Sequence, residues 1–128
     1  MTPKPESTPA IAPGALSNAQ GPITMTIDIG GSGLKAMLLD AKGKPVSERQ
    51  RVLTPEVPTP DAVLKGLDEL HKLIGKANFD RVSVGFPGVV KHGVTLGAFN
   101  LHPTWAGFPL QAELEKRWKK PVRVGNDA

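Results

Sequence analysis

Two short segments of the sequence contain the residue types that phosphoryl transfer requires. The first runs from Thr26 to Lys35 and places Asp28 immediately before a Gly-Gly-Ser-Gly turn. The second, residues 125–128, ends an apolar alternating stretch with Asn-Asp. If both strand ends meet at one edge of a sheet, a phosphate-binding turn faces a carboxylate that could act as a base. That arrangement is typical of a phosphotransferase.

The candidate phosphate-binding residues are Gly30, Gly31, Ser32, Gly33 and Lys35. Backbone N–H groups of such a turn could bind an anion, the serine adds a hydroxyl and the lysine adds positive charge. A second strand is expected after the turn, whereas a dinucleotide fingerprint requires a helix there. The segment also lacks the spacing of a Walker loop. Taken alone, a plain hairpin turn is the commoner explanation, because glycine adopts positive φ without steric cost.

Two carboxylates and an amide are the other chemical candidates at the strand ends. Asp28 could hold Mg²⁺, which prefers a few hard oxygen ligands together with substrate phosphates, or it could bond the backbone of the turn. Asp127 is the candidate catalytic base, because an attacking hydroxyl needs a carboxylate to accept its proton. Asn126 offers a donor and an acceptor to sugar hydroxyls. Both of the last two residues could instead cap a helix.

Further candidates lie in loops. Asn100 and Trp105 could supply an amide and an aromatic wall to a sugar subsite, although we expect Trp105 to pack in the core, and Asn100 could equally cap a turn. The segment Phe86-Pro87-Gly88-Val89-Val90 could place backbone groups against a ligand, but a simple chain reversal explains it better. The three histidines show no metal-ligand spacing and receive no role.

The elements that must position these residues indicate an α/β domain with a mixed sheet. A strand over 82–86, a helix over 109–119 and a strand over 122–126 form a crossover unit, so the two strands should be parallel. Ligands gather at the carboxyl ends of such strands. The remaining expected elements are a three-stranded meander over 23–29, 34–40 and 46–53, a helix over 60–74 capped by Thr59 and stopped by Gly75, and a hairpin turning at 91–93.

Composition restricts the functional classes. The 128 residues suffice for one domain with a core, and the net charge of +4 is only mildly basic. The sequence has no cysteine, no apolar run of about 18 residues and no secretory signal pattern. We therefore expect no membrane span and a cytoplasmic location. Residues 1–22 are a proline-rich tail that we expect to be disordered. The basic run at 116–120 predicts a solvated helix end and not a nucleic-acid surface.

Taken together, these motifs resemble the ROK family, named for repressors, open reading frames and sugar kinases. The segment 28–35 resembles the family's first phosphate motif, and 85–93 is most similar to the polyphosphate glucokinases within the family. The order and spacing of the later motifs also match, so that the resemblance covers residues 24–128. These motifs are Asn100-Leu101, Trp105, Pro109-Leu110, Pro121-Val122 and Asn126-Asp127-Ala128.

The resemblance implies an actin-like, ribonuclease-H-like domain. It implies phosphoryl transfer from polyphosphate, ATP or both to the 6-hydroxyl of glucose, with Asp127 as base, Asn100 and Asn126 as sugar contacts, and Asp28 beside the phosphate-binding turn. Residues 23–128 would be the N-terminal lobe of a longer kinase, homodimeric when full length, and this piece alone would be inactive. Alternatives are a non-enzymatic sugar-sensing regulator of the same family, or an ATP-only kinase for another hexose.

Two departures from the family pattern bear on the donor. Ser32 replaces the usual threonine of the phosphate motif and keeps the hydroxyl. His102-Pro103 stands where polyphosphate glucokinases have Asp-Lys, so the choice between polyphosphate and ATP stays open.

Overall fold

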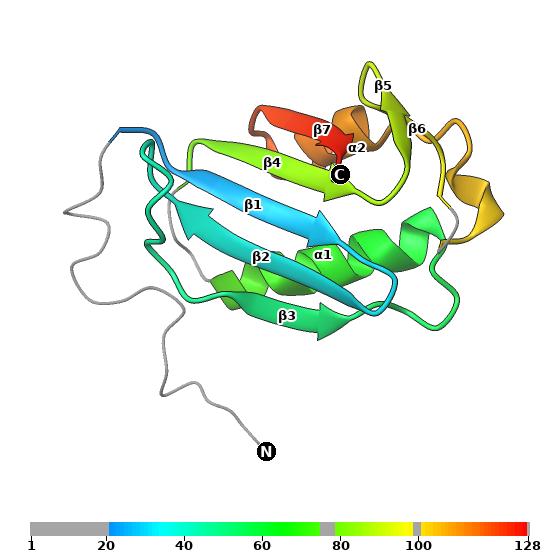
Figure 1. The fold of residues 1–128 in the computed structure, drawn as a ribbon, viewed down its shortest axis with the longest axis horizontal. Coiled ribbons are helices and arrows are strands. Elements are labelled where there is room, and N and C mark those ends of the chain that lie inside the picture. The colour runs from blue at the N-terminus through cyan, green and yellow to red at the C-terminus, as the bar shows by residue number, and fades with distance from the viewer. Residues whose placement is uncertain (1–20, 75–78, 99–100, 128) are drawn as a thin grey trace.

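The computed structural model describes residues 21–74, 79–98 and 101–127 (Figure 1). These residues form strands and two α-helices in the order that the sequence predicts, together with a short 3-10 helix that was not predicted. The elements are β1 (Thr24–Ile29), β2 (Gly33–Leu39), β3 (Gln50–Leu53), α1 (Pro60–Ile74), β4 (Arg81–Phe86), β5 (Val89–Lys91), β6 (Val94–Gly97), the 3-10 helix (Pro103–Trp105), α2 (Leu110–Trp118) and β7 (Val122–Asn126).

A mixed sheet with the strand order β3-β2-β1-β4-β7 forms the centre of the described residues. β1 is antiparallel to β2 but parallel to β4, and β4 is parallel to β7. The parallel pairing predicted for 82–86 and 122–126 is therefore confirmed. The carboxyl ends of β1, β4 and β7 consequently lie at the same edge of the sheet, whereas β5 and β6 form a separate hairpin.

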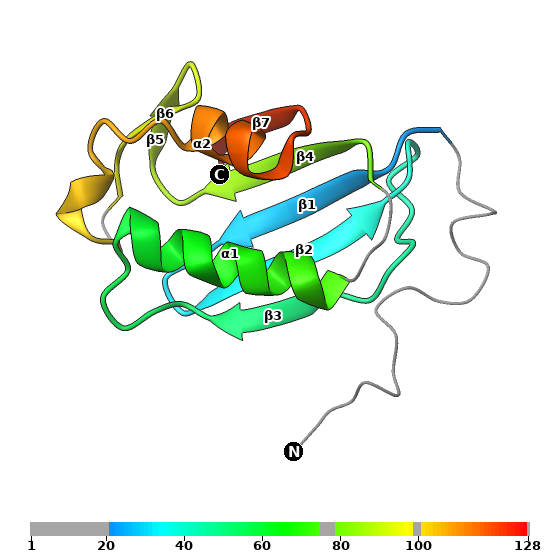
Figure 2. The same cartoon turned by 180° about the vertical axis from the view of Figure 1, so that it is seen from behind.

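Helices α1 and α2 lie on the same face of the sheet, as the two opposite views show (Figures 1 and 2). The strand residues on that face are apolar and buried, including Met25, Ile27 and Ile29 of β1. On the other face, which we call the open face, the same strand carries Thr24, Thr26 and Asp28. Burial of a large aliphatic side chain contributes about 1.5–3 kcal/mol, so this one-sided pattern fixes which face receives the helices.

The start of α1 follows the predicted capping pattern. The Thr59 hydroxyl accepts a hydrogen bond from the backbone N–H of Ala62 at 3.3 Å, and the Thr59 carbonyl accepts one from Val63 at 2.9 Å. Pro60 is the first helical residue, where its missing N–H costs nothing. The buried stripe of the helix is the predicted one and comprises Val63, Leu67, Leu70 and Ile74. The predicted stop, Gly75, lies outside the described residues.

The third strand is shorter than predicted, because its first half leaves the ladder. Val46 still bonds the carbonyl of Leu38 through its N–H at 2.9 Å. The N–H of Leu38, however, donates to the hydroxyl of Ser47 at 2.9 Å instead of to a backbone carbonyl. A side chain therefore replaces the backbone partner at this point, and regular pairing with β2 resumes only at Gln50.

The basic run near the end of α2 behaves as a helix terminus, as predicted. Arg117 forms an ion pair with Asp68 of α1 at 2.6 Å, and Lys119 closes the helix in the left-handed conformation at φ 57°.

Within the described ranges, no helix is long and apolar enough to cross a membrane.

Candidate functional site

The two predicted carboxylates are brought together across Gly85. Asp28 of β1 is the direct register partner of Gly85 in β4, on the open face. A Cβ atom placed on Gly85 would lie 3.2 Å from the Cβ atom of Asp127. The Asp127 side chain thus occupies the space beside this glycine, between the end of β7 and the end of β1. Both aspartates are exposed to solvent at the sheet edge.

The end of β7 is fixed to the turn that follows β4. The backbone N–H of Asp127 donates to the carbonyl of Phe86 at 3.0 Å. The side-chain amide nitrogen of Asn126 donates to the carbonyl of Gly88. A Cβ atom on Gly88 would lie 2.0 Å from the carbonyl oxygen of Gly97, so only glycine fits there. The turn reverses the chain, as expected, and also gives Asn126 a defined orientation beside Asp127.

The glycine turn between β1 and β2 is held closed by hydrogen bonds. The N–H of Gly30 donates to the carbonyl of Gly33 at 3.0 Å. The Thr54 hydroxyl donates to the carbonyl of Gly30 at 2.6 Å, and Arg51 Nη2 donates to the carbonyl of Ser32 at 3.0 Å. Two side chains from the β3 side therefore fix the conformation of the predicted phosphate-binding turn, while Gly31 and Ser32 are exposed.

Sequence reasoning missed Arg51 and Thr54 as parts of this site. Their only signal in the sequence is a basic residue in a short polar strand and a threonine directly after it. Neither feature indicates a contact with a turn about twenty residues earlier, because that contact depends on the β2–β3 register.

The direction of Lys35, which the sequence left open, is given by the strand register. Lys35 is directly opposite Asp28 of β1 and also directly opposite Arg51 of β3. Cross-strand partners project from the same face of a sheet, so Lys35 lies on the open face with both of them. A pocket of about 300 Å³ on this face is lined by Asp28, Lys35 and Arg49, together with Thr26, Ile27, Ala36 and Met37.

Two loop candidates have different outcomes. Asn100 lies outside the described residues, and its sugar contact stays a prediction. Trp105 is fully buried, as expected for a core residue, and its indole N–H donates to the carbonyl of Pro58 at 2.8 Å. Its ring packs against Phe86 with 5.0 Å between centroids. Trp105 therefore packs in the core against Phe86, the last residue of β4, and does not form an exposed aromatic wall.

The three histidines take part in a ring stack, a hydrogen bond and a turn. His71 stacks on Trp118 at 5.4 Å between ring centroids, and His102 Nδ1 lies 2.7 Å from the hydroxyl of Thr104. His92 adopts φ 54° in the β5–β6 turn. Among the residues that the structure describes, no group of three or more His, Cys, Asp or Glu side chains is placed to hold a metal.

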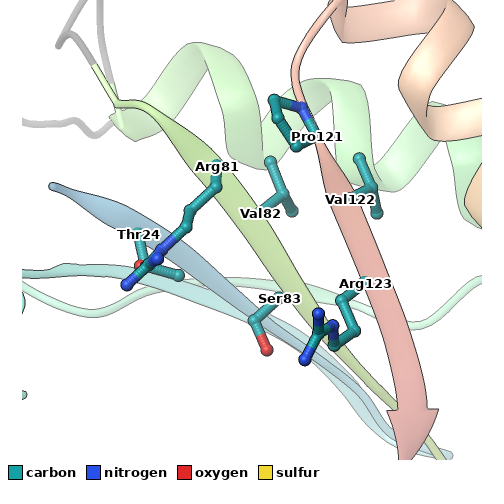
Figure 3. A pocket seen from close by; sticks show the side chains of 7 residues that line it. All are labelled: Thr24, Arg81, Val82, Ser83, Pro121, Val122 and Arg123. Carbon is teal, nitrogen blue, oxygen red and sulfur yellow. The ribbon is translucent and has the colours of Figure 1, made fainter.

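A larger pocket, of about 460 Å³, lies at the opposite end of the strands (Figure 3). Arg81 and Arg123 project into it on the same side as Thr24 and Ser83, and Arg81 Nε donates to the Thr24 hydroxyl at 2.8 Å. Arg81 precedes Gly85 by four strand residues, or about 13 Å. This pocket is therefore separate from the edge where the carboxylates and the glycine turn meet.

Comparison with known proteins matches this chain to a family. The model of the ROK family matches residues 24–128. A polyphosphate glucokinase from Mycobacterium tuberculosis is 38% identical over 96 residues, which cover 74% of this chain and 34% of that protein. An N-acetylmannosamine kinase from Salmonella newport is 36% identical over 107 residues, covering 82% of this chain and 36% of that protein. The chain thus spans about a third of the length of these curated relatives.

Solved structures agree with the sequence matches. The crystal structure of an inorganic polyphosphate/ATP-glucomannokinase from Arthrobacter sp. strain KM has a TM-score of 0.76 and 36% sequence identity, covering 85% of this chain and 45% of that one. ROK sugar kinases have the actin-like ATPase fold, and the predicted fold class is thereby confirmed. The chain belongs to the ROK family.

Proposed function

We propose that residues 23–128 are the N-terminal lobe of a sugar kinase that transfers a phosphoryl group from polyphosphate or ATP to the 6-hydroxyl of glucose. The observation that carries this proposal is the placement of Asp28 and Asp127 on either side of Gly85, at the same sheet edge as the glycine turn. The polyphosphate glucokinase and the glucomannokinase described above support this choice of reaction.

On the acceptor side, Asp127 accepts the proton of the attacking sugar hydroxyl and orients its oxygen toward phosphorus. A carboxylate in this role accelerates transfer typically by 10²–10⁴-fold. Asn126 binds a neighbouring hydroxyl, and its hydrogen bond to the Gly88 carbonyl holds its amide in place for this contact. Asn100 is the second proposed sugar contact.

On the donor side, the phosphates bind to the turn formed by Gly30, Gly31, Ser32 and Gly33. Lys35 lies on the adjacent open face. Asp28 is the proposed Mg²⁺ ligand. Mg²⁺ keeps several waters and binds to one or two carboxylates plus substrate phosphates, so it does not need a cage of protein ligands. The exposed Asp28 at the sheet edge fits that preference. When bound, Mg²⁺ neutralises charge on the phosphates.

Assays of the full-length protein test this function. Purified protein is given polyphosphate or ATP as donor, with glucose, mannose and N-acetylmannosamine as acceptors. The proposal expects glucose 6-phosphate from at least one donor and a higher kcat/KM for glucose than for the other sugars. N-acetylmannosamine is included because a kinase for that sugar is 36% identical to this chain. A higher kcat/KM for N-acetylmannosamine than for glucose would make N-acetylmannosamine the acceptor. Absence of any sugar phosphate would contradict the proposal.

We also propose that the full-length kinase is a cytoplasmic homodimer, and that residues 1–128 alone are inactive. The absence of cysteine from the sequence agrees with a reducing compartment. Light scattering coupled to size exclusion gives the oligomeric state of the full-length protein. Assay of residues 1–128 alone tests the inactivity directly, because turnover comparable to that of the full-length protein would show that this piece contains a complete site.

A further inference from the structure

We propose that Lys35, Arg49 and Arg51 form a binding site for the phosphate groups of a polyphosphate donor that extend beyond the transferred one. We call these three residues the cationic subsite. This inference rests on the proposed function and adds to it the part of the surface that selects a polymeric donor. The subsite is assembled on the open face, on the β2–β3 side of the glycine turn.

Strand register and the pocket place the three cations together. Lys35 of β2 is directly opposite Arg51 of β3, and side chains of such pairs lie on the same face. Arg49, just before β3, lines the 300 Å³ pocket that Lys35 and Asp28 also line. Both arginines are exposed. The pocket lining thus contains two cations, Lys35 and Arg49, with the carboxylate of Asp28, and Arg51 lies directly opposite Lys35.

Lys35 has a like charge directly opposite it in β3, that of Arg51, and an opposite charge directly opposite it in β1, that of Asp28. Like charges directly opposite each other across two strands destabilise a sheet. In the ranges that the structure describes, neither residue forms an ion pair, whereas Arg117 pairs with Asp68 between the helices. A bound polyanion would neutralise both cations at once and would remove this repulsion.

Arg51 connects the cationic subsite with the glycine turn. Its Nη2 atom donates to the carbonyl of Ser32 at 3.0 Å. A Cβ atom on Gly33 would lie 2.6 Å from Arg51 Nε, so the guanidinium occupies the space that a side chain at Gly33 would fill. A guanidinium has five N–H donors, and the bond to Ser32 uses one of them. The remaining donors are available to phosphate oxygens next to the turn.

The composition of the pocket favours a chain of phosphates over a nucleotide. The cations continue from the turn at Ser32 through Arg51 and Lys35 to Arg49, so positive charge extends along the sheet. A polyphosphate carries negative charge on every repeat and can match each of them. ATP carries three phosphates and then an uncharged nucleoside, so it offers fewer negative charges to this row of cations.

The test compares single charge removals on the open face in the full-length protein. Arg49→Gln removes a charge of the subsite without touching the glycine turn, and Arg81→Gln removes an exposed charge at the other end of the same face. KM and kcat are measured for polyphosphate and for ATP at saturating glucose. We expect Arg49→Gln to raise the KM for polyphosphate at least fivefold and the KM for ATP less than twofold. Arg81→Gln should change neither by more than twofold.

A second variant addresses the residue that contacts the turn. Arg51→Lys keeps the charge but loses the planar fork that bonds Ser32, whereas Arg51→Gln loses both. We expect Arg51→Gln to raise the KM for polyphosphate more than Arg51→Lys does.

Added KCl gives a further readout. The KM for polyphosphate should increase less steeply with KCl in Arg49→Gln than in the wild type, because a removed charge leaves less attraction for salt to screen.

The outcomes separate this inference from the proposed function. If wild-type protein uses polyphosphate but Arg49→Gln behaves like Arg81→Gln, the subsite is overturned and the kinase assignment stands. If wild-type protein phosphorylates no sugar, the proposed function fails, and calorimetric titration with tripolyphosphate decides on the subsite. Binding that Arg49→Gln weakens at least fivefold, and Arg81→Gln does not, supports the subsite. Absence of binding, or equal binding by the two variants, overturns it.

Discussion

Asn126 donates a hydrogen bond from its side-chain amide to the backbone carbonyl of Gly88, and this bond joins the end of β7 to the turn after β4. The residue that we propose as a sugar contact is therefore also part of the scaffold. Its neighbour Asp127 is held by a backbone bond to Phe86 in the same region. The orientation of the acceptor side of the site thus depends on contacts between β4 and β7.

Asn126→Asp should weaken sugar binding and loosen this junction. A carboxylate cannot donate to the Gly88 carbonyl and would repel it. We expect the KM for glucose to rise at least tenfold, which corresponds to about 1.4 kcal/mol, with a decrease in the free energy of unfolding of no more than about 1 kcal/mol because the residue is exposed. Steady-state kinetics and thermal unfolding measure the two effects. An unchanged KM would show that the amide neither binds the sugar nor orients the site.

Asp127→Asn should abolish most of the turnover while leaving the protein folded. The amide has nearly the shape of the carboxylate but cannot accept the hydroxyl proton, so kcat should decrease by roughly 10²–10⁴-fold. Glucose binding, measured by calorimetry, should change far less than kcat. A kcat within twofold of the wild type would remove Asp127 from the role of base and would favour a different mechanism of proton removal.

Thr54→Val tests whether the β3 side controls the phosphate-binding turn. The change removes the hydroxyl that donates to the Gly30 carbonyl at 2.6 Å and keeps the volume of the side chain. We expect a loss of about 1 kcal/mol of stability and a higher KM for the phosphoryl donor. Thr24→Val is the matched control, because it removes the hydroxyl that accepts from Arg81 at the other end of the sheet. An equal change in donor KM for both variants would contradict the assignment.

Trp105→Phe distinguishes a core tryptophan from a sugar-binding one. The substitution removes the indole N–H that bonds the Pro58 carbonyl and part of a fully buried ring. Loss of the bond and of packing should lower the free energy of unfolding by about 1–3 kcal/mol. The KM for glucose, measured well below the unfolding transition, should stay within twofold. A tenfold rise in that KM without a change in stability would instead place the ring in contact with the sugar.

Asp28→Asn tests the proposed magnesium ligand. An amide oxygen is a weaker ligand for Mg²⁺ than a carboxylate, so the Mg²⁺ concentration for half-maximal rate should rise at least about tenfold. Titration of the rate with MgCl₂ at fixed donor measures this shift. An unchanged Mg²⁺ dependence would leave Asp28 with the alternative role of bonding the turn.

The sequence predicted the framework of the site because its signals are local. Alternation in β1, the Thr59 cap of α1 and the crossover from β4 to β7 each follow from residues close together in the chain. Parallel pairing then places the strand ends carrying Asp28 and Asp127 at one edge. The family resemblance added the roles of these residues, which neither spacing nor composition supplies.

The contacts that complete the site could not be predicted in the same way. The bonds from Arg51 and Thr54 to the glycine turn depend on the register of β3 against β2. That register differs from a simple extension of the pattern, because the Ser47 hydroxyl replaces a backbone partner and delays the start of β3. Alternation gives the face of a strand residue but not its cross-strand partner.

Asp28 belongs to a strand with neighbours on both sides, whereas Asp127 follows β7, which within the described residues pairs with β4 alone. Within these residues, β7 is therefore expected to open at lower free energy than β1, and the proposed base follows the less stable of the two strands. Local opening of β7 would then displace Asp127 before these residues unfold. In hydrogen exchange of residues 1–128, the amides of β7 would report this local opening, and those of β1 would report unfolding of the whole sheet.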